Sequence, residues 1–270
     1  MASEPERLGG GGFGGSWGWR RQALFQGATV RRELLVDTLA TLCGLFFGTA
    51  VVALIVSFRL PLGWDFVASV ILSLALMFAL VVHALPSHPH LRFGYANLVT
   101  AVRASLVSLT GSTVLCFENL AATDLALWTL VCVVLLALAL DGVDGHLARR
   151  YHQESALGAR FDMEIDALLI LILSLAAALL DKAGPWVVMI GLMRYAFVAA
   201  GWMLPRLNGA LPPSFRRKLV CVLQIAALCI IVVPFVMPPY STVIAAAALI
   251  GLVYSFAVDV LYLLRQPVAP

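Results

Sequence analysis

Residues 125–140 read LALWTLVCVVLLALAL, and Asp141-Gly-Val-Asp144-Gly145 follows directly. The run contains no charged residue. A helix that crosses a lipid bilayer needs about 20 mostly apolar residues. The stretch therefore predicts a membrane-spanning helix that carries two carboxylates at its end.

Seven more apolar runs lie on either side of this one. The run at 167–180 reaches the length of a span only if it is extended back through residues 158–166. The run at 98–118 is less apolar, because it contains Arg103 and several Ser and Thr. We expect eight transmembrane helices in all, with the other runs at residues 38–58, 66–85, 185–205, 219–237 and 242–264. The sequence predicts an all-α integral membrane protein.

The composition supports this fold class. Of 270 residues, 61% are hydrophobic and 12% are charged, and the mean hydropathy is +0.96. Soluble domains average about 25% charged residues, so a water-soluble enzyme and a disordered chain are both disfavoured. The net charge of +3 is also too small, and too dispersed, to indicate a nucleic-acid partner.

The basic residues predict the orientation in the membrane. If the N-terminus is cytoplasmic, 15 of the 18 Lys and Arg residues fall at cytoplasmic ends, whereas Arg59 and Lys182 fall on the opposite side. This asymmetry follows the positive-inside rule. We therefore expect the residues after position 140 to face the cytoplasm, and a bacterial inner membrane is the expected location.

Residues 1–35 differ from the rest of the chain. A glycine-rich stretch at 9–15 is followed by Trp17, Trp19 and several arginines. We expect a flexible, basic and aromatic cytoplasmic segment. Two interpretations stay open: a segment that lies on an anionic membrane surface, and a tail that only sets topology.

Acidic residues are costly in a membrane protein, and they cluster here. Asp141 and Asp144 are three positions apart, and Asp162 and Asp166 are four apart, so each pair shares a helix face. Two helices meeting near this loop place four carboxylates together at the cytoplasmic edge. The alternative is that these acids cap helices and pair with arginines nearby in the sequence. Six of the 15 acidic residues lie in this region: Asp141, Asp144, Glu154, Asp162, Glu164 and Asp166.

Carboxylates at close range repel one another, and a divalent cation relieves that repulsion. An all-oxygen set suits Mg²⁺ or Mn²⁺. Magnesium usually shares its coordination shell with substrate phosphates. The residues alone thus indicate a metal-dependent phosphate reaction at the membrane surface.

The whole string is Asp141-Gly-Val-Asp144-Gly145-His-Leu-Ala148-Arg149, eight residues, Gly158, three residues, Asp162, three residues and Asp166. It resembles the signature of the CDP-alcohol phosphotransferase family at every fixed position. The segment Asn97-Leu-Val-Thr100 with Arg103 looks like the opening of the family's first core helix. The resemblance covers residues 97 to about 264. It implies a six-helix catalytic core at 91–266, preceded by two additional transmembrane helices at 36–90.

The resemblance implies that a CDP-linked lipid, usually CDP-diacylglycerol, donates its phosphatidyl group to an alcohol and releases CMP. Asp141, Asp144, Asp162 and Asp166 would hold Mg²⁺ or Mn²⁺, two ions in all, and Asp166 would be the general base. The residues implied in binding the CDP group are Asp141, Asp144, Gly145, Ala148, Arg149, Gly158, Asn97 and Thr100.

The acceptor alcohol is less defined. Arg194 lies inside a predicted span, and Arg217 and Lys218 begin another, so these three could bind a phosphorylated acceptor such as glycerol 3-phosphate. Related enzymes with such acceptors have a Gly-Lys-x-Lys-like stretch here, whereas this chain has Arg217-Lys218-Leu-Val. Inositol phosphate, serine and choline stay open as acceptors.

Two rival functions stay open as well. One is an enzyme of the same family that uses CDP-choline or CDP-ethanolamine as donor. The other is a cation transporter, although the runs at 125–140 and 167–180 offer almost no polar path. By family analogy we also expect a homodimer in contact with membrane lipids.

Overall fold

The computed structural model describes residues 15–60, 62–85, 93–116, 124–150, 156–209, 211–212 and 214–265. Side chains are described from residue 32 onward, except at 124, 144–149, 156 and 208 within these ranges. The described residues form eight α-helices and no strand, which confirms the predicted fold class. The helices are α1 (Gly15–Arg59), α2 (Gly63–Ala84), α3 (Tyr95–Leu115), α5 (Asp124–Arg150), α6 (Ala156–Leu179), α7 (Val188–Met203), α8 (Phe215–Val232) and α9 (Tyr240–Arg265).

Six of the described helical segments are long and apolar enough to cross a membrane. They are Arg32–Arg59, Gly63–Ala84, Tyr95–Leu115, Leu125–Val143, Pro185–Met203 and Tyr240–Arg265. The sequence predicted eight spans; the other two, α6 and α8, carry several charged residues near their first turns. These charges mark the end of the bundle where the candidate site lies.

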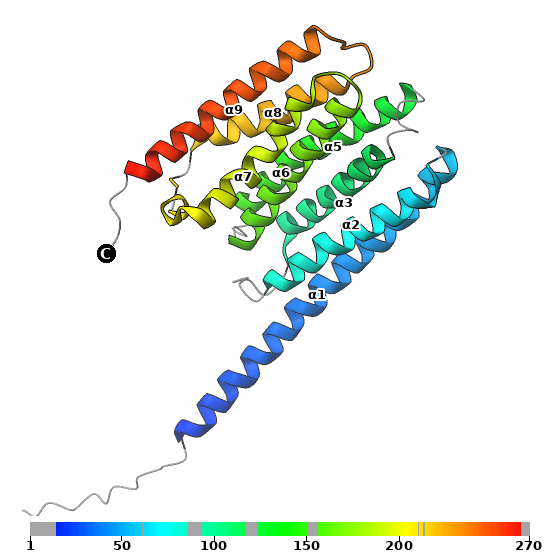
Figure 1. Cartoon of the computed structure of the whole chain (residues 1–270). Coiled ribbons are helices and arrows are strands. Elements are labelled where there is room, and N and C mark those ends of the chain that lie inside the picture. Colours follow the sequence, from blue (N-terminus) through cyan, green and yellow to red (C-terminus); the bar gives the residue numbers. More distant parts are fainter. Residues whose placement is uncertain are drawn as a thin grey trace, which may run out of the picture.

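Helix α3 lies at the centre of the bundle. It packs against α5 and α6, while α1 and α2 cover one side and α7, α8 and α9 lie on the other (Figure 1). The core joins Val107 of α3, Val134 of α5 and Leu173 of α6. Three helices that follow one another in the chain are thereby held side by side, and each contributes to the site.

Helices α6 and α7 approach closely because α7 has a glycine at the contact. A Cβ atom added to Gly191 would lie 2.4 Å from Leu171 Cα and 2.6 Å from Ser174 Oγ. Small residues allow membrane helices to pack at such short range. Gly191 therefore fixes the position of α6 relative to α7.

A buried lysine joins two loops at the end of the bundle opposite α6's first turn. The Lys182 ammonium donates hydrogen bonds to the carbonyls of Val233, Pro234 and Val236, at 2.9–3.1 Å. The distribution of basic residues predicts Lys182 on the side opposite most of them, and the residue is 4% exposed. These carbonyls lie just beyond the end of α8, and they supply the hydrogen-bond acceptors that the buried ammonium needs.

Helix α1 begins at Gly15, well before its membrane-crossing part. Residues 15–35 are helical and continuous with the span, whereas residues 1–14 lie outside the described range. The first half of α1 extends beyond the other helices (Figure 1). Helices α1 and α2 both pack against α3, and α1 is also joined to the residues before α3, since Asp37 Oδ2 accepts a hydrogen bond from the Phe93 amide at 3.1 Å.

Candidate active site

Three carboxylates meet at one end of the bundle. Asp162 and Asp166 share a face of α6, as their spacing predicted, and Asp141 reaches them from α5. One oxygen atom from each of the three lies within 4.8 Å of the others. The side chains of Asp141 and Asp166 are 16% and 15% exposed, and that of Asp162 is 36% exposed. The cluster is thus half-buried and open on one side.

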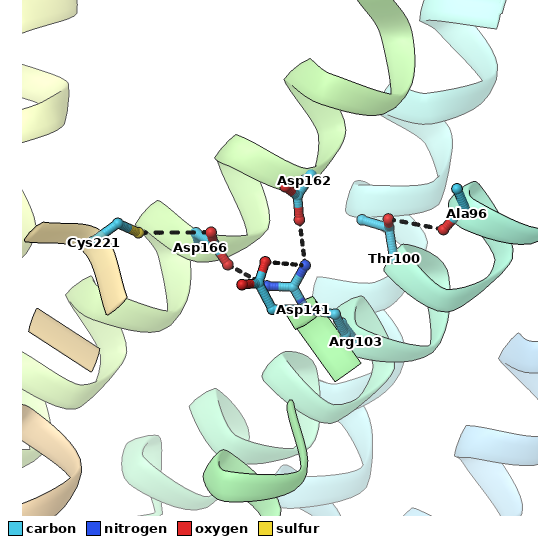
Figure 2. Close-up of polar contacts among 7 residues, drawn as sticks. All are labelled: Ala96, Thr100, Arg103, Asp141, Asp162, Asp166 and Cys221. Atoms are coloured by element: carbon cyan, nitrogen blue, oxygen red, sulfur yellow. Dashed lines mark hydrogen bonds and ion pairs between the residues drawn. The ribbon is translucent and has the colours of Figure 1, made fainter. Parts of the chain in front are cut away.

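Arg103 of α3 lies in the middle of the cluster. Its Nη1 is 3.2 Å from Asp141 Oδ1 and also donates to Asp162, while Nη2 donates to Asp166 (Figure 2). The Arg103 residue is 1% exposed. In the described contacts these acids pair with an arginine of another helix and not with arginines nearby in the chain: Arg103 lies 59 positions before Asp162 and 63 before Asp166.

A thiol also contacts the cluster. Cys221 of α8 lies beside Asp166, with its Sγ 3.6 Å from Asp166 Oδ2 (Figure 2). A thiol is a weak hydrogen-bond donor, so this oxygen stays a good acceptor. Four helices, α3, α5, α6 and α8, therefore supply the side chains around Asp166.

The donor set fits a divalent cation. Three carboxylates with their oxygens this close provide the hard oxygen ligands that Mg²⁺ and Mn²⁺ prefer. Waters or substrate oxygens can complete an octahedral shell from the open side, which is how Mg²⁺ is usually bound. Asp144, Gly145, Ala148 and Arg149 lie on the last turns of α5, where the structure does not describe the side chains.

The other residues expected near the CDP group lie close by in the fold. Asn97 lies about two turns and Thr100 about one turn before Arg103 on α3, and both are buried. Asn97 Nδ2 donates to the Phe93 carbonyl at 2.5 Å, and Thr100 Oγ1 donates to the Ala96 carbonyl at 3.1 Å. Gly158 lies one turn before Asp162 on α6. All three are therefore on the helices that build the cluster.

Two of the residues expected to bind the acceptor, Arg194 and Lys218, lie near different carboxylates of α6. Arg194 of α7 pairs with Glu164, whose carboxylate lies on a different face of α6 from Asp162 and Asp166. Lys218 of α8 is exposed, and its positive charge is close enough to interact with Asp162. Lys218 thus lies nearer to the carboxylate cluster, whereas Arg194 has a different carboxylate partner.

Arg217 belongs to a second charged cluster, between α8 and α9. Asp259 Oδ1 is 2.5 Å from Arg216 Nη2 and 3.4 Å from Arg217 Nη1. Arg216 Nη1 also donates to the Ser255 hydroxyl at 2.7 Å. Asp259 therefore has two basic partners. One carboxylate shared by two guanidiniums leaves a net positive charge at the start of α8.

Sequence reasoning did not find the roles of Arg103 and Cys221 in this cluster. Arg103 was recognised as part of a short motif, and its presence inside an otherwise uncharged run was the available signal. Cys221 gave no signal, since a cysteine in an apolar helix is common. Contacts between distant helices decide both roles.

The helices and the buried acidic cluster define an integral membrane protein with a polar site at one end of its bundle. Residues 93–256 match the family model described as CDP-alcohol phosphatidyltransferase. The match covers more than half of the chain, and the protein belongs to that family. No curated protein and no solved structure gives a significant match to the chain.

Proposed function

We propose that this protein transfers the phosphatidyl group of CDP-diacylglycerol to a small alcohol and releases CMP. The observation that carries the proposal is the group of Asp141, Asp162 and Asp166, within the matched region and at the open end of the bundle. Family membership supports transfer from a CDP-alcohol. The donor lipid enters from the bilayer and the alcohol from water, and the site lies where the two phases meet.

The site residues have separate proposed roles in the reaction. Asp141, Asp144, Asp162 and Asp166 would hold Mg²⁺ or Mn²⁺, two ions in our proposal. A bound divalent cation neutralises the pyrophosphate and stabilises the CMP leaving group. Gly145, Ala148, Arg149 and Gly158, with Asn97 and Thr100, would contact the CDP group, as the family resemblance implies.

Asp166 is the proposed general base. Its Oδ1 accepts from Arg103, and its Oδ2 faces the weakly donating thiol of Cys221. We assign proton transfer to Oδ2, because a base must accept the acceptor proton at hydrogen-bond distance. As the hydroxyl oxygen bonds to the lipid-linked phosphorus, the bond from that phosphorus to the bridging oxygen breaks. CMP leaves with that oxygen.

We propose a phosphorylated acceptor, glycerol 3-phosphate first. The support is the excess positive charge at the start of α8, where Asp259 is shared by Arg216 and Arg217 and where Lys218 is exposed. An anionic acceptor is attracted to such a surface. Arg217 and Lys218, with Arg194, are the proposed acceptor-binding residues.

The test is CMP release by the purified protein with CDP-diacylglycerol, Mg²⁺ or Mn²⁺ and a panel of alcohols. The proposal expects release with glycerol 3-phosphate and a lower rate for Lys218→Gln, mainly through a higher KM. Release with inositol phosphate, serine or choline would reassign the acceptor. Release from CDP-choline with a diacylglycerol would reassign the donor. Cation flux in liposomes without CMP release would replace the enzyme with a transporter.

The cellular setting is part of the same proposal. The protein is an integral membrane protein of a membrane-bound family. We place it in a bacterial inner membrane with the site toward the cytoplasm, following the distribution of basic residues. We also propose a homodimer. Cross-linking in native membranes tests the dimer, and labelling of cysteines introduced near Arg59 tests the orientation.

A further inference from the structure

Arg103 contacts the same three carboxylates that could hold a cation. It contacts Asp141 Oδ1, Asp162 Oδ1 and Asp166 Oδ1 directly. These are carboxylates of the group that could hold a metal ion. The guanidinium is therefore a neighbour of any bound cation, and its position is set by three helices at once.

Burial keeps the Arg103 guanidinium in the site. The residue is 1% exposed and lies inside the apolar part of α3, at the ninth position of a membrane-crossing segment. A charged group cannot leave such a position for water without moving the helix. The arginine must consequently stay close to the carboxylates whether or not a cation is bound.

Arg103 neutralises part of the negative charge of the described cluster. Three carboxylates carry three negative charges, and Arg103 supplies one positive charge. Without the arginine, three unneutralised carboxylates would repel one another at short range, which is strongly unfavourable in a half-buried site. With it, two negative charges remain on these three carboxylates for bound cations to neutralise.

We propose that Arg103 is a built-in counter-ion that holds the three carboxylates together when no cation is bound and that weakens cation binding by competing for their oxygens. The inference rests on the proposed metal site and adds a positioning residue to it. Arg103 acts through Asp141, Asp162 and Asp166. It makes the cation-free site stable enough to persist between binding events.

The proposal predicts opposite effects of losing Arg103 on two properties, the stability of the cation-free protein and the affinity for the cation. Loss of Arg103 should destabilise the cation-free protein, because the carboxylates lose their partner. The same loss should strengthen cation binding, because a unit charge about 5 Å from a divalent ion opposes it by roughly tenfold in affinity even with water-like screening. A residue needed only for packing would lower stability without improving affinity.

The experiment measures Mn²⁺ binding by electron paramagnetic resonance and thermal unfolding, both in detergent without substrate. Arg103→Gln should bind Mn²⁺ about tenfold more tightly than wild type and should melt at a lower temperature without cation. The difference in melting temperature should shrink when Mn²⁺ is saturating. Arg103→Lys keeps the positive charge but loses the planar guanidinium that bonds several carboxylates at once. The changes in melting temperature and in Mn²⁺ affinity should therefore be smaller, with affinity within about threefold of wild type.

Arg216→Gln is the matched control. It removes an arginine that also pairs with an aspartate, but Asp259 is outside the carboxylate cluster. This variant should lose some stability and leave the Mn²⁺ affinity unchanged.

Equal or weaker Mn²⁺ binding by Arg103→Gln, with binding by wild type intact, would overturn the competition. Absence of Mn²⁺ binding in both proteins would overturn the metal site itself, and with it the proposed function. If Arg103→Gln does not fold even with saturating Mn²⁺, the Arg103→Lys variant tests the inference instead. A cation-free melting temperature and an Mn²⁺ affinity both equal to wild type in that variant would overturn the inference.

Discussion

Replacing Gly191 with alanine tests whether close packing of α7 on α6 holds the candidate site in place. The added Cβ would lie 2.4 Å from Leu171 Cα and 2.8 Å from Leu171 Cδ1. The backbone atom cannot move aside without moving α6. Leu171 is little more than one turn beyond Asp166, so the displacement also reaches the carboxylate cluster.

Two opposing effects set the size of the change. Alanine in a helix interior is about 1 kcal/mol better than glycine. Overpacking typically costs about 1–3 kcal/mol, and contact with a backbone atom places this site at the upper end. Gly191→Ala should therefore lower the stability by about 2 kcal/mol in net terms.

Gly251→Ala on α9 is the matched control, because a Cβ there meets no atom within 4 Å. It should gain up to about 1 kcal/mol from helix propensity. The two alanine variants should thus differ by about 3 kcal/mol, or roughly 6–12 °C in apparent melting temperature. The assay is thermal unfolding in one detergent at one scan rate, since membrane proteins often unfold irreversibly. A melting temperature for Gly191→Ala at or above that of Gly251→Ala would refute the reasoning.

Three other changes have defined outcomes. Lys182→Gln should lower the melting temperature by several degrees, because the carbonyls of Pro234 and Val236 lose their lysine donor at about 1–3 kcal/mol for an unsatisfied group, whereas Val233 O keeps the Val236 amide as a donor; Mn²⁺ affinity should stay unchanged, and a changed affinity would contradict a purely structural role. Asp259→Asn should free positive charge at the start of α8 and lower the KM for an anionic acceptor while lowering stability, as measured by CMP release and unfolding scans; an unchanged KM would argue that this cluster is not near the acceptor. Removal of divalent cations with a chelator should abolish CMP release and leave the helical circular dichroism signal, and activity that survives exhaustive chelation would exclude the metal site.

The helices could be predicted because their signal is local. Uncharged runs of about 20 residues have one stable form in a bilayer, so composition alone indicated an all-α membrane protein. The spacing of Asp162 and Asp166 likewise placed them on one helix face, and the same periodicity puts Glu164, two positions from each, on another. The structure agrees, since Glu164 pairs with Arg194 rather than with the cluster.

The contacts of Arg103, Cys221 and Lys182 could not be predicted in this way. They join segments that are distant in sequence, and the periodicity of the sequence does not encode such contacts. Arg103 meets Asp162 across 59 positions, and Cys221 meets Asp166 across 55. Lys182 appeared to be an ordinary charge on the far side, yet it binds carbonyls more than 50 residues away. Each of these pairings requires the packing of α3, α6 and α8 to be known first.

The most direct test of the central claim is CMP release by purified protein with CDP-diacylglycerol, Mn²⁺ and glycerol 3-phosphate, compared with Asp166→Asn. Loss of a general base typically costs about 10²–10⁴ in rate, and the variant should still fold. Asp65→Asn makes the same chemical change at an exposed position on α2, outside the matched family region, and should keep wild-type activity. Metal-dependent CMP release that falls at least a hundredfold in Asp166→Asn is the predicted result. An Asp166→Asn variant as active as wild type would contradict the role of Asp166, and no CMP release by the folded, Mn²⁺-bound wild type with any donor and acceptor of the panel would contradict the proposed reaction.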